Sequence, residues 1–81
     1  MTVVTLYGKP GCHLCDDARR VIDQVRGERE FELQEIDITR DAGLFREYGE
    51  RIPVVAVDGS EQFEFFVDSE GLARALDRVS P

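Results

Sequence analysis

The two cysteines of this 81-residue chain, Cys12 and Cys15, lie three positions apart at the junction between a predicted strand and a predicted helix. The segment TVVTLY, residues 2–7, is rich in β-branched residues and apolar on both faces, which is typical of a strand in the middle of a sheet. The GKPG segment after it interrupts the strand. Over residues 13–26 apolar side chains recur with helical spacing, and Gly27 ends the helix. The sequence therefore places the cysteine pair at the start of a helix that follows a buried strand.

The rest of the chain alternates strands and helices, with no linker-like, repetitive or low-complexity stretch. Apolar residues alternate with polar ones where a strand is expected, and recur every three or four positions where a helix is expected. The predicted elements after the first helix are a strand over residues 31–38, a short helix capped by Asp41 and ended by Gly49, a strand over 54–57, the hairpin pair Asp58 and Gly59, a strand over 61–67, and a last helix capped by Ser69.

Two of these elements carry more detailed predictions. The strand over residues 31–38 changes the phase of its apolar residues before Ile36, so we expect it to bulge or to end early. The last helix buries one face, made of Leu72, Ala75, Leu76 and Val79. Because crossovers between parallel strands are right-handed, the first two strands are expected to be parallel neighbours, with the closing hairpin antiparallel to the first strand.

Length and charge limit the functions to be considered. A chain of 81 residues has room for one modest core, so residues 1–81 are expected to form a single domain and to act as a monomer. No apolar run approaches the roughly 20 residues that span a bilayer, and the first residues lack a signal-peptide pattern, so a cytoplasmic location is expected. A formal net charge of −7 argues against nucleic acid or a membrane surface as the partner, and favours a role in keeping the protein in solution.

The segment YGKPGCHLC, from Tyr7 to Cys15, resembles the active segment of small glutaredoxin-like proteins, and Pro53 opens an apolar strand as in the thioredoxin fold. The resemblance covers essentially the whole chain. It implies an α/β fold of the thioredoxin-like, glutaredoxin type, with the order βαβαββα, a four-stranded mixed sheet and three helices. It also implies a thiol-disulfide oxidoreductase with a dithiol mechanism. Its partners would be a disulfide-containing protein substrate and a reductase or glutathione, with no bound cofactor.

The spacing of the cysteines suits this chemistry. Residues i and i+3 of a helix lie on the same side, close enough for a disulfide to form and break with little backbone movement. Cys12 at the helix start is the predicted nucleophile, since free N–H groups and the helix dipole lower thiol pKa values at such sites to about 3.5 to 7.5. Cys15, one turn further, is the predicted resolving thiol that attacks the mixed disulfide.

Other readings of the cysteine pair remain. Two cysteines are half of a zinc site, but no second CxxC or HxxxH completes four ligands, so no metal site is predicted within one chain. A metal or iron-sulfur carrier in which Cys12 and Cys15 of two chains share an ion or cluster is the alternative function. A third reading keeps the fold and makes the pair an inert staple.

Five further residues are predicted to contribute to substrate binding, each with a plainer alternative. Lys9 and His13 bring positive charge near the thiolate or are solvated surface residues. The resemblance implies a cis peptide before Pro53, with the backbone of Ile52 free to pair with an extended substrate. Ser69 either receives a carboxylate at a helix N-terminus or only caps the helix, and capping is preferred.

The sequence departs from the glutaredoxin pattern near the last helix. Proteins of that family usually carry a Gly-Gly pair there, which holds the γ-glutamyl end of glutathione, whereas this chain has Phe66 and Val67 followed by Asp68 and Ser69. The residues between the cysteines, His13 and Leu14, also differ from the pairs of dithiol glutaredoxins and thioredoxins. We therefore expect glutathione to be a poor reductant for this protein.

Overall fold

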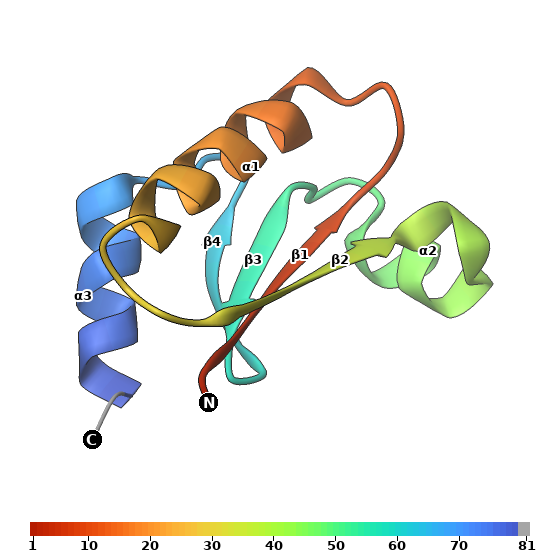
Figure 1. Cartoon of the computed structure of the whole chain (residues 1–81). Helices are drawn as coiled ribbons and strands as arrows, with labels where there is room; N and C mark the ends of the chain where they lie inside the picture. The colour runs from red at the N-terminus through yellow and green to blue at the C-terminus, as the bar shows by residue number, and fades with distance from the viewer. Residues whose placement is uncertain (80–81) are drawn as a thin grey trace.

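The computed structural model describes residues 1–79, which form a four-stranded sheet and three α-helices (Figure 1). In chain order the elements are β1 (Val3–Gly8), α1 (His13–Arg26), β2 (Glu32–Asp37), the 3-10 turn η1 (Ile38–Arg40), α2 (Ala42–Tyr48), β3 (Val54–Val57), β4 (Ser60–Glu64) and α3 (Ser69–Val79). This order confirms the predicted βαβαββα arrangement.

The strands lie in the order β2-β1-β3-β4, with β1 in the interior of the sheet as predicted. Leu6 of β1 pairs with Glu35 in the parallel neighbour β2 and with Val55 in the antiparallel neighbour β3. Since β3 runs opposite to both β1 and β4, the C-terminal ends of β1, β2 and β4 lie at the same edge of the sheet. The chain leaves this edge from β1 toward Cys12 and from β4 toward α3.

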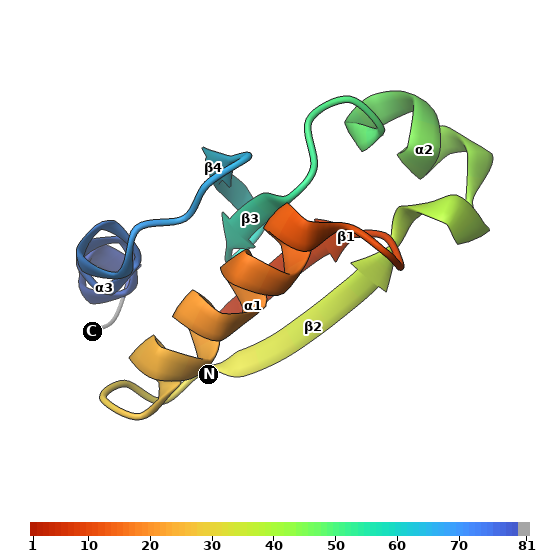
Figure 2. The same cartoon turned by 90° about the horizontal axis from the view of Figure 1, so that it is seen from above.

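The main core lies between the sheet and the helices α1 and α3, which contact each other. It combines apolar side chains of two strands and two helices with Phe31, which directly precedes β2: Val4, Leu6, Ala18, Ile22, Val25, Phe31, Val55, Val57, Leu72, Ala75 and Leu76. Burial of each large aliphatic side chain contributes about 1.5 to 3 kcal/mol. The helix α2 has no buried residue and lies on the opposite side of the molecule from α3 (Figure 2). This helix is therefore held mainly through its neighbours near the cysteines.

The helix α1 begins and ends where the sequence predicts. Its buried residues Cys15, Ala18, Ile22 and Val25 follow one face at helical spacing, and Gly27 is the C-cap. Its outer face is charged. Within residues 1–79, no helix is both long enough and apolar enough to cross a membrane.

The strand β2 ends early, which is one of the two predicted outcomes. It pairs with β1 in a regular parallel register as far as Asp37, so it has no bulge and ends one residue before Ile38. Ile38 is buried because the chain turns there into η1, and the Asp37 carboxylate accepts hydrogen bonds from the N–H and the hydroxyl of Thr39. The irregular register of this sheet lies between β3 and β4 instead, at Val55 and Ala56.

The segment between β4 and α3 corrects two predictions, and the end of α3 corrects a third. β4 ends at Glu64 and does not reach Val67, because Phe65 has a φ of 66° and leaves the extended conformation. Asp68 caps α3 in place of Ser69, since its carboxylate accepts the N–H of Gly71 at 2.9 Å. Ser69 is the first residue of α3. At the other end of this helix, Val79 is 43% exposed and does not join the buried face.

Candidate active site

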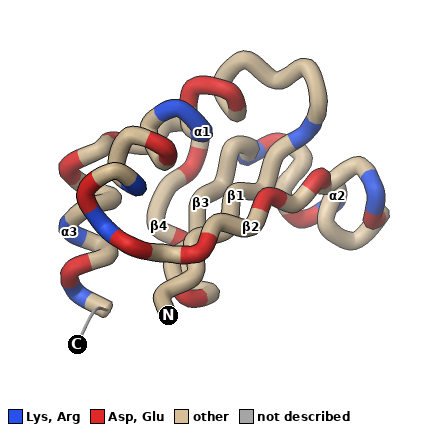
Figure 3. Tube along the Cα trace, viewed as in Figure 1, with Lys and Arg blue, Asp and Glu red and all other residues tan. Residues whose placement is uncertain are grey.

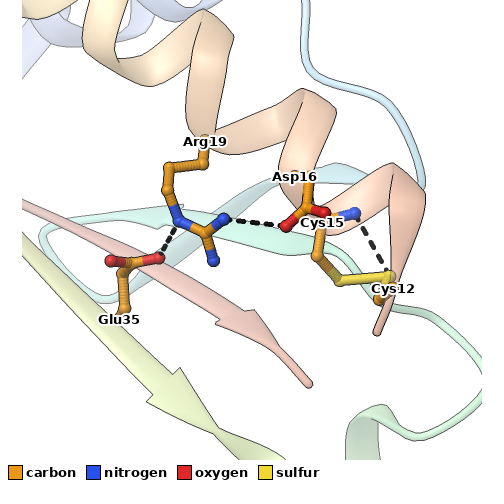
Figure 4. The surroundings of a disulfide bond; sticks show 5 residues. All are labelled: Cys12, Cys15, Asp16, Arg19 and Glu35. Atoms are coloured by element: carbon orange, nitrogen blue, oxygen red, sulfur yellow. Dashed lines mark hydrogen bonds and ion pairs between the residues drawn. A yellow bond between two sulfur atoms is a disulfide. The ribbon is translucent and has the colours of Figure 1, made fainter. Parts of the chain in front are cut away.

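The two cysteines form a disulfide at the start of α1 (Figure 4), with their Cα atoms 5.2 Å apart. Cys12 is the N-cap residue, and the N–H of Cys15 donates to its sulfur at 3.1 Å. Cys12 is half-buried, whereas Cys15 is 1% exposed. Cys12 is thus the more exposed residue of the pair, and Cys15 is covered by the protein.

The covering of Cys15 begins with Gly8, the last residue of β1. A Cβ atom at this position would lie 2.9 Å from the sulfur and 3.2 Å from the Cβ of Cys15, which is too close for a side chain. Sequence reasoning used Gly8 only as part of the segment that ends the strand. Its closeness to Cys15 depends on the packing of α1 over β1, which the sequence does not specify.

An apolar cluster covers the disulfide on the side of α2. Cys15, Ile38 and Ile52 are buried together, and the half-buried side chains of Tyr7, Cys12, Leu44 and Tyr48 pack against them. The rings of Tyr7 and Tyr48 stack with their centroids 4.3 Å apart. Burial of the Tyr48 hydroxyl raises its pKa, and the neighbouring Tyr7 adds to the shift. The predicted site residue Ile52 therefore lies against the cysteine pair.

Pro53 follows Ile52 through a cis peptide bond, in agreement with what the family resemblance implies. Its carbonyl accepts the N–H of Phe65 at 2.8 Å, which connects this loop to the end of β4. The structure thus brings together Cys12, Cys15, Ile52 and Pro53, all of which were predicted site residues.

Arg51 holds the same loop from the other side, and sequence reasoning missed it. Its guanidinium donates to Glu64 of β4 at 2.8 Å, also bonds Glu61, and lies 5.4 Å from the ring centroid of Tyr48. The hydrogen bonds to the two carboxylates raise the pKa of Arg51. Because the partners lie 10 and 13 residues away on another strand, the sequence alone gave no signal for this arrangement.

A charged hollow of about 260 Å³ borders Cys15 on the side of β2. Arg19 of α1 spans it, donating to Glu35 of β2 at 2.5 Å and to Asp16 at 2.9 Å (Figure 4). These hydrogen bonds raise the pKa of Arg19, that to Glu35 most strongly. In the sequence, the three-residue spacing of Asp16 and Arg19 was a signal for an ion pair within the helix. The contact between Arg19 and Glu35 could not be predicted, because it depends on the register in which β1 and β2 pair.

The other three predicted site residues are not part of the apolar cluster around the cysteines. Lys9 is exposed and forms part of the wall of the charged hollow, and His13 is exposed on the first turn of α1. Ser69 is half-buried at the start of α3 and does not line this hollow. Among residues 1–79, no group of three or more His, Cys, Asp or Glu side chains is placed to hold a metal ion.

Residues 3–77 match the family model described as Glutaredoxin-like domain (DUF836). The chain belongs to this family. It is 31% identical over 80 residues to the uncharacterized protein Rv0508 of Mycobacterium tuberculosis, an alignment that covers 93% of this chain and 82% of that protein.

Solved structures of other proteins share this fold. The protein XcR50 of X. campestris is 32% identical, with a TM-score of 0.77, and the match covers 95% of this chain and 99% of that one. A thioredoxin of Halobacterium salinarum is 19% identical, with a TM-score of 0.73, and the match covers 99% of this chain and 75% of that one, which shows the fold alone. The glutaredoxin-like family and the CxxC pair on a thioredoxin-like fold support a redox role in general.

Proposed function

We propose that this protein is a thiol-disulfide oxidoreductase that reduces disulfides in other proteins through Cys12 and Cys15. The observation that carries the proposal is the unequal exposure of two sulfurs at one helix start, with Cys12 half-buried and Cys15 covered. A disulfide in another molecule can approach the outer sulfur, and the inner sulfur is protected from it. This asymmetry is what a dithiol mechanism requires of a nucleophile and a resolving thiol.

In the first step, the reduced Cys12 attacks one sulfur of the partner disulfide. The N–H of Cys15 donates to the Cys12 sulfur and stabilises it as a thiolate, and the start of α1 adds the positive end of the helix dipole. The partner S–S bond breaks as the new S–S bond forms. The leaving partner thiolate takes a proton from solvent.

In the second step, the Cys15 thiol loses a proton and its sulfur attacks the sulfur of Cys12. The mixed disulfide breaks, the second partner thiolate leaves, and the Cys12–Cys15 disulfide forms across Cα atoms 5.2 Å apart. The protein has then transferred two electrons to its partner; the first partner sulfur took its proton from solvent, and the second takes up one in place of the proton that Cys15 released. A dithiol donor restores the reduced pair by the same exchange in reverse.

The partner and the donor are part of the proposal. We propose a protein substrate, and a protein dithiol of the thioredoxin-reductase type as the donor in preference to glutathione. The loop before β3 and the apolar cluster of Tyr7, Ile52 and Tyr48 favour an extended peptide beside Cys12. We further expect the protein to act as a monomer in the cytoplasm without a bound cofactor, with Lys9 and His13 attracting an anionic or polarised sulfur.

The test compares Cys12→Ser and Cys15→Ser in reduction of a fluorescent disulfide-linked peptide dimer. We expect Cys12→Ser to abolish reduction. We expect Cys15→Ser to form a mixed disulfide with the peptide and to release it only slowly, which mass spectrometry of acid-quenched samples would detect.

The rate of alkylation by iodoacetamide near pH 6 provides an independent readout. The thiol of Cys12 should react much faster than that of Cys15, because it is both more exposed and more ionised. Equal alkylation rates, or a stable mixed disulfide on Cys15 in the Cys12→Ser protein, would contradict the assigned roles.

A further inference from the structure

Phe65 and Phe66 are large apolar side chains that the fold leaves in solvent. Phe65 is 43% exposed and Phe66 is 72% exposed. Phe65 has a φ of 66°, a backbone conformation that bulky residues rarely adopt, and the N–H of Phe66 donates to the carbonyl of Glu64 at 2.7 Å. Strained residues of this kind cluster at functional sites, since the conformation persists only where the surrounding structure maintains it.

This aromatic pair lies at the sheet edge that carries the cysteines. The C-terminal ends of β1 and β4 share that edge, and the segment after β4 leads directly into Phe65 (Figures 1 and 2). The N–H of Phe65 donates to the carbonyl of Pro53 at 2.8 Å. Ile52, the residue before Pro53, packs in the same cluster as both cysteines. A chain that crosses the Ile52–Pro53 loop to reach Cys12 therefore passes beside Phe65.

The charge around the two phenylalanines is mainly negative. Residues 61–70 contain the carboxylates of Glu61, Glu64, Asp68 and Glu70 and no Lys or Arg. Figure 3 shows acidic residues on α1, α3 and the strands, in line with the net charge of −7. Part of the local charge is neutralised by Arg51, which binds Glu61 and Glu64. On the side of α3, Glu70 lies 3.8 Å from Arg74 in an exposed pair, and Asp68 accepts the N–H of Gly71. Both carboxylates stay exposed to solvent, where they favour a cationic neighbour.

We propose that Phe65, Phe66 and the carboxylates of Asp68 and Glu70 form a docking surface for an extended segment of the partner protein. That segment carries an aromatic or large aliphatic residue close to its disulfide, next to Lys or Arg. The inference rests on the proposed function and adds the class of substrate to it. Aromatic side chains at the centre of a contact, with charged groups around them, are the usual anchors of protein recognition.

Other occupants fit this surface less well. Glutathione has no apolar side chain for the phenylalanines and carries net negative charge, which the carboxylates of Asp68 and Glu70 repel. A second copy of this chain would repeat the same negative charge. Two phenylalanines also supply only about 150 to 250 Å² each, whereas a specific interface buries about 1,200 to 2,000 Å² in total. A partner segment that is also held at Cys12 by a mixed disulfide does not need so large an area.

The experiment measures single-turnover reduction by the pre-reduced protein, so that no electron donor enters the result. One disulfide-linked peptide carries Phe and Arg beside its cysteine, and a matched peptide carries Ser and Glu at those positions. Hydroxyethyl disulfide reports the basal activity. The variants are Phe66→Ser and Phe65→Asn, and Phe45→Ser is the matched control because Phe45 is 50% exposed on α2, a helix on the opposite side of the molecule from α3.

We expect the unmodified protein to reduce the Phe and Arg peptide about tenfold faster or more than the Ser and Glu peptide. Phe66→Ser and Phe65→Asn should reduce this preference to about twofold or less, with Phe45→Ser leaving it intact. Reduction of hydroxyethyl disulfide should not change in any variant. Higher ionic strength should weaken the preference, because screening removes the contribution of the carboxylates.

Four results would overturn the inference. The first is that the two peptides are reduced at equal rates, and the second is that the variants lose hydroxyethyl disulfide reduction in parallel with peptide reduction. The third is that Phe66→Ser slows the reduction of glutathione disulfide as much as that of the peptide. The fourth is that the unmodified protein forms a dimer that Phe66→Ser dissociates. If the protein reduces none of these disulfides, the proposed function fails. Docking is then tested by titrating the protein with a Cys-free version of the Phe and Arg peptide and following the NMR signals of Phe65 and Phe66. If these signals do not shift, the docking surface is rejected.

Discussion

Gly8 and Cys15 lie against each other where β1 and the first turn of α1 meet, and this contact explains why the sulfur at position 15 is the covered one. The absence of a side chain at Gly8 lets the helix approach the strand closely enough to bury that sulfur. Cys12, as the N-cap residue, stays at the surface. A small residue on a strand therefore maintains the difference between the two thiols.

We predict that Gly8→Ala destabilises the protein, by about 1 to 3 kcal/mol in the free energy of unfolding, as is usual for overpacking. The added Cβ would lie 2.9 Å from the sulfur of Cys15, and neither the helix nor the disulfide can move without disturbing the pair. Urea unfolding followed by circular dichroism measures this loss. We also expect Cys15 to alkylate faster in the reduced variant, because the displaced helix exposes its sulfur.

Gly27→Ala is the matched control for this substitution. Gly27 has a φ of −69°, and a Cβ there would meet only the carbonyl oxygen of Gln24, at 3.4 Å. The cost should be small or the variant slightly more stable, since Ala restricts the unfolded chain. If both variants unfold at the same urea concentration, the close contact at Gly8 has no energetic importance.

At the scale of elements, the sequence predicted those whose signals are local. The apolar spacing and the capping residues define α1 and α2, and the Asp58–Gly59 pair defines the hairpin, so these elements lie where expected. The end of β4 was missed because Phe65 adopts a backbone conformation that favours Gly or Asn, and no residue type signals it. The contacts of Gly8, Arg19 and Arg51 were missed for another reason. They join elements distant in sequence, so only the assembled sheet defines them.

The start of α3 gives a prediction that separates two neighbouring residues. Asp68→Ala should lower stability by about 0.5 to 2 kcal/mol, because the N–H of Gly71 loses its acceptor. Ser69→Ala should change stability little, since Ser69 already has helical neighbours on its C-terminal side and is the first residue of the helix. Thermal unfolding of both variants measures the difference. A larger loss for Ser69→Ala would return the capping role to that residue.

At the scale of the whole molecule, acidic groups outnumber basic ones by 17 to 10, so only a few carboxylates can form ion pairs with another element. Arg29, after α1, donates to both oxygens of Asp77 on α3, at 2.9 and 3.1 Å. These hydrogen bonds lower the pKa of Asp77 below its ordinary value of 3.8. A carboxyl group with a lowered pKa in the folded state stabilises the protein above its unfolded pKa, and this contribution disappears as the pH falls through the folded value.

We therefore predict that Asp77→Asn lowers stability at pH 7, and that the difference from the unmodified protein narrows below about pH 4. The measurement is the urea midpoint of both proteins from pH 7 to pH 3. Asp23→Asn is the control, because the structure shows no ion pair for Asp23 with any of the described residues. A difference that stays constant across this range would mean that the Arg29–Asp77 pair does not depend on the carboxylate charge.

The choice of electron donor is also a property of the whole surface near the cysteines. By the family resemblance, Phe66 and Val67 take the place of the Gly-Gly pair of glutaredoxins, and we expect the backbone there to approach a glutathione molecule less closely. The loss of two charge-assisted hydrogen bonds, at about 1.5 to 3 kcal/mol each, weakens binding by about a hundredfold or more. The distant carboxylates matter less, because charges beyond about 8 Å are screened at physiological ionic strength.

We predict that glutathione with glutathione reductase supports only slow turnover, and that a thioredoxin-reductase-type enzyme or a protein dithiol reduces the Cys12–Cys15 disulfide faster. A coupled assay that follows nicotinamide oxidation, with each donor at matched concentration, compares them directly. Replacing Phe66 and Val67 together by glycine should raise the glutathione rate if local geometry limits the reaction. Rapid turnover that saturates at low millimolar glutathione in the unmodified protein would contradict the prediction, because the missing glycines would then have no effect on how this site receives its electrons.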